Sequence, residues 1–119
     1  MTTELVDNRE LGLKIGYAAT DWGQPISFEV YQEVMKEWII QTIVRDGRCI
    51  GAVYRKGDEL HVSITPEWRR RWITKGLLQK LFNKNRVVTK VSPGHDYMYD
   101  ILSRLGFKKT FDNWMVKEN

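Results

Sequence analysis

The chain has 119 residues, of which 42% are apolar and 29% charged, a size and balance that fit one globular domain over residues 1–119 with a single modest core. Cys49 is the lone cysteine, so an internal disulfide is excluded and a reducing, cytoplasmic setting is expected. Cys49 also lacks Cys or His partners at metal-ligand spacing, so we expect no metal site. No stretch approaches the ~18 apolar residues of a membrane span, so we expect no membrane association. The net charge of +4 favours anionic partners in general, which include nucleotides, coenzymes and nucleic acid.

The first part of the chain predicts a strand and then a helix. A strand is expected at 13–18, ended by the Gly- and Pro-bearing segment 21–25. Ser27 is a plausible N-cap for an amphipathic helix over 28–37, because large apolar residues recur there at helical spacing. These are Phe28, Tyr31, Met35 and Trp38.

Two hairpins follow and predict a three-stranded meander. The segment 39–45 is strand-like, Asp46-Gly47 is a strong two-residue turn, and 49–55 makes the return strand. A second turn at 56–58 leads into a strand over 59–65. Along this strand Leu60, Val62 and Ile64 face one way, and Glu59, His61 and Ser63 face the other.

The pattern then becomes helical and predicts a crossover. A helix is expected over 68–82, a short strand over 86–91, a break at Pro93-Gly94, and a second helix from Asp96 through Leu105. Strands over 107–111 and 114–117 complete the chain. Because a strand, helix, strand crossover lies among hairpins, the predicted fold is α+β, with a mixed, mostly antiparallel sheet and helices on both faces.

Three consecutive arginines open the expected helix over 68–82. Arg69, Arg70 and Arg71 lie between Trp68 and Trp72. A cation near a helix N-terminus is unfavourable by roughly 0.3 to 1 kcal/mol, so an anion is the expected guest. The alternatives are a solvated basic helix end and tryptophans that serve packing rather than the stacking of bases.

Three segments resemble the GNAT acetyltransferase superfamily, whose members transfer an acyl group from acyl-coenzyme A to an amine. Residues 46–51 look like the turn and glycine between the family's second and third strands, and 64–69 like its fourth strand and the start of its coenzyme-binding helix. Residues 102–107 resemble the end of its last helix and the following Gly-Phe. The resemblance covers roughly 39–117, and it extends to small diverged members encoded by tailed bacteriophages, including internal virion proteins.

The resemblance implies an acetyl-CoA site. The coenzyme's pyrophosphate would lie at the basic helix start and its pantetheine arm along the fourth strand, which assigns Ile64, Arg69, Arg70, Arg71, Trp72, Ile73 and Thr74 to cofactor binding. The family's loop glycines, however, are replaced by Arg70, Trp72 and Thr74, so an indole would have to swing outward to leave the loop amides accessible.

The catalytic groups of the family are matched poorly. Its frequent general acid, a tyrosine, falls on Leu102, and Tyr97 and Tyr99 lie nearby. His61 is a weak candidate for the general base, with an ordinary surface histidine as the alternative. His95 falls where the family often has an asparagine, and Glu59 and Glu67 are further candidates for the base, with solvated carboxylates as the preferred alternative.

Two classes of function therefore compete. In one, the chain is an active acyl-CoA-dependent N-acetyltransferase whose arginines clamp the coenzyme phosphates. In the other, which the substitutions favour, the fold is kept with reduced or absent transfer, and the basic, tryptophan-rich face binds an acidic protein, nucleic acid or another anion. A phage-encoded member would act in the host cytoplasm or the virion. The final strand over 114–117 could pair with another chain in a homo-oligomer or assembly.

Overall fold

The computed structural model describes residues 3–19, 26–69, 71–91 and 95–118. The strands are β1 (Thr3–Val6), β2 (Ile39–Arg45), β3 (Arg48–Lys56), β4 (Glu59–Ile64), β5 (Arg86–Lys90), β6 (Lys108–Lys109) and β7 (Trp114–Glu118). The helices are α1 (Arg9–Ala19), α2 (Phe28–Val34), the 3₁₀ turn η1 (Pro66–Trp68), α3 (Lys75–Leu81) and α4 (Tyr97–Arg104). The expected positions 21–25 and Pro93-Gly94 lie outside the described residues.

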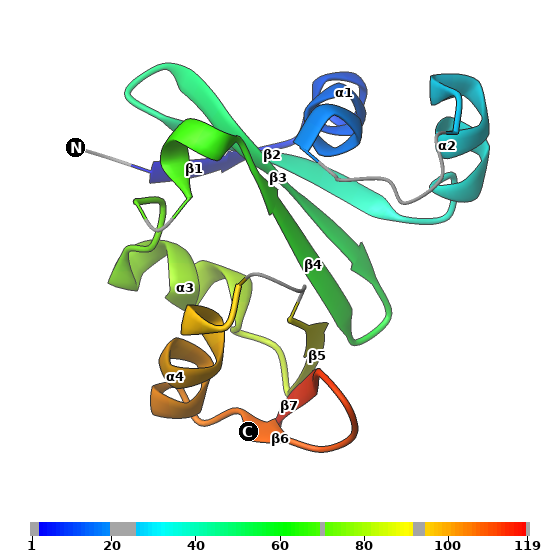
Figure 1. Cartoon of the computed structure of the whole chain (residues 1–119). Helices are drawn as coiled ribbons and strands as arrows, with labels where there is room; N and C mark the ends of the chain where they lie inside the picture. The colour runs from blue at the N-terminus through cyan, green and yellow to red at the C-terminus, as the bar shows by residue number, and fades with distance from the viewer. Residues whose placement is uncertain (1–2, 20–25, 70, 92–94, 119) are drawn as a thin grey trace.

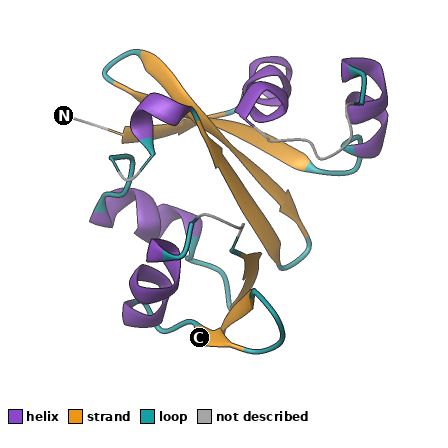
Figure 2. Ribbon diagram, viewed as in Figure 1, coloured by secondary structure: helices purple, strands orange, loops and turns teal. Residues whose placement is uncertain are grey.

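The strands form one mixed sheet in the order β1-β2-β3-β4-β5-β7-β6 (Figures 1 and 2). Strands β4 and β5 are parallel, and the other neighbours are antiparallel. Helix α3 connects the parallel pair, which is the predicted crossover. The predicted α+β class and its mostly antiparallel sheet are therefore confirmed.

Helices cover both faces of the sheet, as expected. Helices α1 and α2 lie on one side and α3 and α4 on the other (Figure 1). The smaller core, under α1 and α2, is made of Leu13, Tyr31, Ile40, Ala52 and Tyr54. The larger core, under α3 and α4, takes the alternate strand residues together with Leu77, Leu78, Leu81, Phe82 and Leu102. Alternation along the strands assigns most of these residues to one of the two cores, while a register shift between β2 and β3 places both Ile50 and Val53 in the larger core.

The meander is confirmed with small changes at its ends. Asp46 and Gly47 both have positive φ, at 51° and 78°, as a type I′ hairpin turn requires.

Ser27 caps α2, since its Oγ accepts the Val30 amide at 3.2 Å. Helix α2 is shorter than expected, and the strand expected over 107–111 is reduced to the two residues of β6.

The strand expected at 13–18 is wrong, because this segment lies within helix α1. Its apolar residues fit an alternating pattern as well as a helical one, and two glycines four residues apart decide the outcome. A Cβ on Gly12 would lie 2.5 Å from Ile40 Cγ2, and one on Gly16 would lie 1.1 Å from the Tyr54 hydroxyl. The bare backbone of α1 thus lies directly on the sheet. Strand β1, which pairs with β2, was not predicted.

The helix expected over 68–82 is wrong in its first part. Pro66–Trp68 forms a 3₁₀ turn, Arg69 is extended with ψ 132°, and the helix begins only at Lys75. Thr74 fixes that start, because its Oγ1 accepts the Leu77 amide at 3.2 Å. Arg69 and Arg71 therefore precede the helix instead of opening it, and the argument from cations at its dipole does not hold.

Candidate ligand-binding cleft

A cleft opens where the two parallel strands diverge. The described residues of β4 and β5 pair at Glu59 and Val88, where the Val88 amide donates to the Asp58 carbonyl at 2.8 Å. Beyond this point the strands separate (Figure 1). The cavity between them has a volume of about 80 Å³. Its lining is Leu60, Val62 and Ile64 of β4, Thr89, Lys90 and Val91, Trp72 and Phe82, and His95, Tyr97, Met98 and Leu102.

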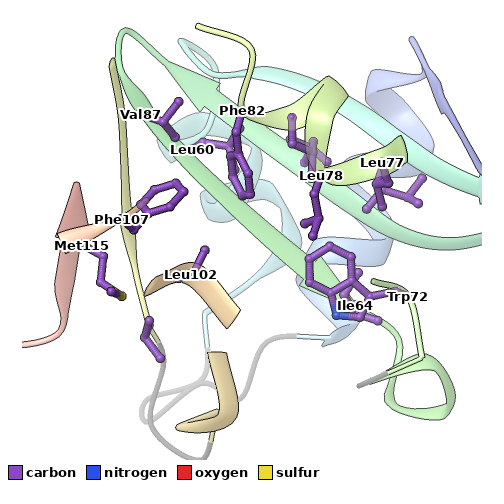
Figure 3. Close-up of a cluster of buried hydrophobic side chains, with 14 of the residues drawn as sticks. Leu60, Ile64, Trp72, Leu77, Leu78, Phe82, Val87, Leu102, Phe107 and Met115 are labelled. Carbon is purple, nitrogen blue, oxygen red and sulfur yellow. The ribbon is translucent and has the colours of Figure 1, made fainter. Parts of the chain in front are cut away.

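Trp72 lines this cleft and is buried in the core beside it. Its side chain is only 4% exposed and belongs to the larger core. Figure 3 shows the indole beside Ile64, below Leu77 and Leu78. The outward position that access to the loop amides would require is therefore not the one that the indole takes, because burying a large aromatic surface against aliphatic neighbours is strongly favourable. Sites for ligands of drug size usually measure about 300 to 1,000 Å³, well above the volume left here.

The remaining predicted coenzyme residues divide between core and surface. Ile64 is buried and Ile73 packs against the larger core, while Arg69 and Arg71 are exposed. Arg70 lies outside the described residues. The Thr74 hydroxyl accepts the Leu77 amide, so this amide at the start of α3 already has its partner.

A cluster of Arg45, Trp68 and Arg71 lies beside the loop that precedes α3. The guanidinium carbon of Arg71 lies 4.8 Å from the centroid of the Trp68 ring, and that of Arg45 lies 5.3 Å from it. Arg45, at the end of β2, also donates from Nη1 to the Arg71 carbonyl at 2.9 Å. We did not predict Arg45, because 26 residues separate it from Arg71 and no local signal links them.

His61 does not line the cleft. It lies on the opposite face of β4, where its Nε2 is 2.5 Å from Glu59 Oε2. Its ring lies between those of Trp38 and Trp114, at centroid distances of 5.6 and 6.1 Å. The structure thus joins two of the predicted candidates in a carboxylate–imidazole pair, while the third, Glu67, is exposed at η1.

Tyrosine hydroxyls lie near the position of the missing tyrosine. Leu102 is 2% exposed and belongs to the larger core. Tyr97 lines the cleft, and its ring stacks on His95 at 6.0 Å. Tyr99 instead lies under Lys109, whose Nζ is 5.0 Å from the ring centroid. Of the two tyrosines that the sequence left open, Tyr97 is therefore the one at the cleft.

Other classes of site have little support in the described residues. Across 3–19, 26–69, 71–91 and 95–118, no three His, Cys, Asp or Glu side chains gather in a way that could hold a metal ion. No helix in these ranges is long and apolar enough to cross a membrane. Burial raises the pKa of the Cys49 thiol, so it stays protonated near neutral pH.

Comparisons with known proteins point to one fold. No protein-family model matches the sequence, and neither does any curated protein. A ribosomal-protein-alanine N-acetyltransferase from Brucella melitensis is similar in structure, with a TM-score of 0.71, 14% identity, and coverage of 98% of this chain and 99% of that one. Ard1 from Thermoplasma volcanium gives a TM-score of 0.69 at 12% identity, with 99% and 98% coverage.

The PaiA N-acetyltransferase from Thermoplasma acidophilum, whose structure is a complex with coenzyme A, gives a TM-score of 0.62 at 16% identity, with both chains covered fully. At sequence identities this low, the structural similarity establishes the fold and leaves the activity open. The mixed sheet with its parallel β4 and β5 pair and the similarity to these structures indicate the same fold. The chain therefore has the fold of the GNAT acyl-CoA N-acyltransferases.

Proposed function

We propose that this protein is a diverged GNAT-fold member in which acetyl-CoA-dependent N-acetyl transfer is reduced or absent. In this proposal the protein acts by binding an acidic protein, nucleic acid or another anion. The observation that carries the proposal is the burial of Trp72 between β4 and α3. The proposal follows the resemblance to small phage-encoded members of the family.

The small volume of the cleft supports this proposal. The cavity of about 80 Å³ is too small for a pantetheine arm, and widening it requires the indole to leave the larger core. Exposing a buried tryptophan costs several kcal/mol, by comparison with the ~3 to 5 kcal/mol of removing one. The Thr74 hydroxyl also competes with a pyrophosphate for the Leu77 amide.

The proton-transfer groups support the same proposal. The buried Leu102 cannot donate a proton to a leaving thiolate. Leu60, Val62 and Ile64 line the cleft from one face of β4, and the Glu59–His61 pair lies on the other face. A positioned acid or base is typically worth ~10² to 10⁴ in rate, so their poor placement is expected to slow transfer substantially.

Replacing Trp72 with glycine tests the proposal. We expect the wild-type protein to show no change in melting temperature with millimolar acetyl-CoA and no signal in isothermal titration calorimetry. Trp72→Gly restores both the space and the glycine of the family's loop, so it is expected to gain saturable binding and a rise of several degrees. A ligand at 100 times its Kd stabilises by about 2.7 kcal/mol.

Leu78→Ala is the matched control, because it also removes a buried side chain of the same core but leaves the Trp72 indole in place. It is expected to lower the melting temperature and to gain no response to acetyl-CoA. Saturable binding of acetyl-CoA by the wild-type protein, together with acetylation of an amine, would overturn the proposal.

The second candidate is an active acyl-CoA-dependent N-acetyltransferase, and Tyr97 is the observation that favours it. Its ring lines the cleft, so its hydroxyl is the available substitute for the family's proton donor. In that case the wild-type protein responds to acetyl-CoA, and Tyr97→Phe lowers kcat with little effect on coenzyme binding. Arg69→Ala with Arg71→Ala then removes the thermal shift.

A further inference from the structure

Two arginines from distant parts of the chain meet at one indole outside the cleft. Arg45 and Arg71 both place their guanidinium groups within about 5 Å of the Trp68 ring centroid. The Arg45 side chain donates to the Arg71 carbonyl at 2.9 Å, and Arg71 Nη1 donates to the Glu67 carbonyl at 3.4 Å. These bonds fix the two planar cations relative to the ring, so the cluster is organised before any ligand arrives.

Two further arginines lie beside the cluster, as do the exposed side chains of Asp46 and Glu67. Arg48 pairs with Arg45 across the β2–β3 hairpin and is exposed, and Arg69 is exposed on the neighbouring loop. Among the described residues, no carboxylate lies within ion-pair distance of Arg48 or Arg71. Cations held close together repel each other, and a bound anion relieves this repulsion.

The chemistry of the cluster distinguishes between anions. A guanidinium group binds phosphate oxygens through two parallel hydrogen bonds. Guanidinium and indole planes also stack unpaired bases. A ligand with several phosphates in a row and accessible bases uses both properties, whereas an acidic peptide uses only the charge.

We propose that Arg45, Trp68 and Arg71 form a binding site for single-stranded nucleic acid. Arg45 and Arg71 hold adjacent phosphates, Arg48 and Arg69 extend the basic track on either side, and an unpaired base stacks against the guanidinium and indole planes. The site lies on the surface formed by the β2–β3 hairpin and the loop before α3. It does not use the cleft, so it is independent of whether coenzyme A binds there.

Fluorescence anisotropy with a labelled thymidine oligonucleotide of about 20 nucleotides tests this site. We expect binding that weakens steeply with salt between about 50 and 200 mM, since each phosphate contact on a single strand contributes about −0.7 to the slope of log K against log salt. Arg45→Gln with Arg71→Gln is expected to reduce the slope by about 1.4 and to weaken binding at least tenfold at low salt.

Arg104→Gln is the matched control, because Arg104 is an exposed arginine of α4 whose partner Asp100 lies on the same helix at 2.9 Å. It is expected to keep the wild-type affinity to within a factor of two to three. Trp68→Phe keeps an aromatic plane and is expected to bind more tightly than Trp68→Leu. Circular dichroism and thermal unfolding establish that each variant is folded.

Three results would overturn the proposal. The first is equal loss of affinity in the double arginine variant and in Arg104→Gln, which would indicate unspecific charge attraction. The second is the absence of oligonucleotide binding at about 50 mM salt. The third is saturable binding of inorganic pyrophosphate or coenzyme A that depends on Arg45 and Arg71 while the oligonucleotide does not bind, because the site would then serve a small phosphate ligand.

Discussion

Gly16→Ala is expected to lower the free energy of unfolding by about 3 kcal/mol, although alanine is the better helix former. A Cβ at this position would lie 1.1 Å from the Tyr54 hydroxyl, 2.4 Å from Tyr54 Cζ and 2.8 Å from the Tyr31 hydroxyl. Tyr31 donates to the Tyr54 hydroxyl at 2.9 Å, and Tyr54 donates to the Gly12 carbonyl at 3.3 Å. Burial raises the pKa of both hydroxyls, so they remain neutral donors.

The added methyl group must therefore push α1 away from the sheet or break this buried pair of hydroxyls. Breaking a buried hydrogen bond costs about 1 to 3 kcal/mol, and displacing packed elements adds to this cost. Thermal unfolding is expected to show a decrease in melting temperature of about 10 °C or more. Tyr54→Phe removes the hydroxyl oxygen closest to the new Cβ. In the Tyr54→Phe background, Gly16→Ala is therefore expected to cause a smaller loss in the free energy of unfolding than it does in the wild type.

Gly76→Ala is the control for helix propensity. Gly76 lies in α3, and a Cβ there meets nothing within 4 Å. The substitution is expected to stabilise the protein by about 0.5 to 1 kcal/mol. If Gly16→Ala is neutral or stabilising in the same way, α1 does not lie on Tyr54 as described.

Ile43→Ala is expected to be the more damaging of two identical substitutions in strand β2. Ile43 is fully buried in the larger core, with 0% exposure. Its truncation is expected to lower the free energy of unfolding by about 2 to 5 kcal/mol, through lost burial and the cavity left behind. Urea unfolding measures this loss, with an unchanged slope if the denatured state is unaffected.

Ile39→Ala is its matched control, because Ile39 begins the same strand and is 63% exposed. It is expected to change the free energy of unfolding by less than about 1 kcal/mol, the range of β-propensity effects. Similar losses at the two positions would contradict the orientation of β2 and the location of the larger core.

The sequence predicted the meander closely because local signals determine it. Asp46-Gly47 specifies a tight turn, and the alternation of Leu60, Val62 and Ile64 with polar residues specifies the buried face of β4. Each of these signals acts over a few residues. The crossover and the mixed sheet then follow from general rules of chain connection.

The sequence failed where contacts between distant residues decide the structure. Alternation at 13–18 is typical of a strand, but Gly12 and Gly16 select a helix by allowing close contact with Ile40 and Tyr54. The aliphatic spacing from Trp68 onward indicates one long helix. The burial of Trp72 and the Thr74 cap delay its start to Lys75 instead.

The arrangement of the candidate site was not predictable from the sequence. The loop before α3 was identified from the resemblance, and its Trp72 lines the cleft, while a role of this loop in coenzyme binding stays a prediction. Whether an indole points inward or outward depends on the space left by Ile64 and Leu78, which a linear pattern does not report. The approach of Arg45 to Trp68 depends on the whole sheet in the same way.

The divergence of β4 and β5 has a consequence for how the molecule can move. The pairing of Glu59 with Val88 joins two parts of the sheet, β1 to β4 and β5 to β7, at one end of the gap between them. Beyond this pair, the described residues of the two parts are held together by packed side chains of the larger core, and no further backbone pairing joins them. Widening the gap therefore requires the packed side chains, Trp72 among them, to separate, and it breaks few backbone hydrogen bonds.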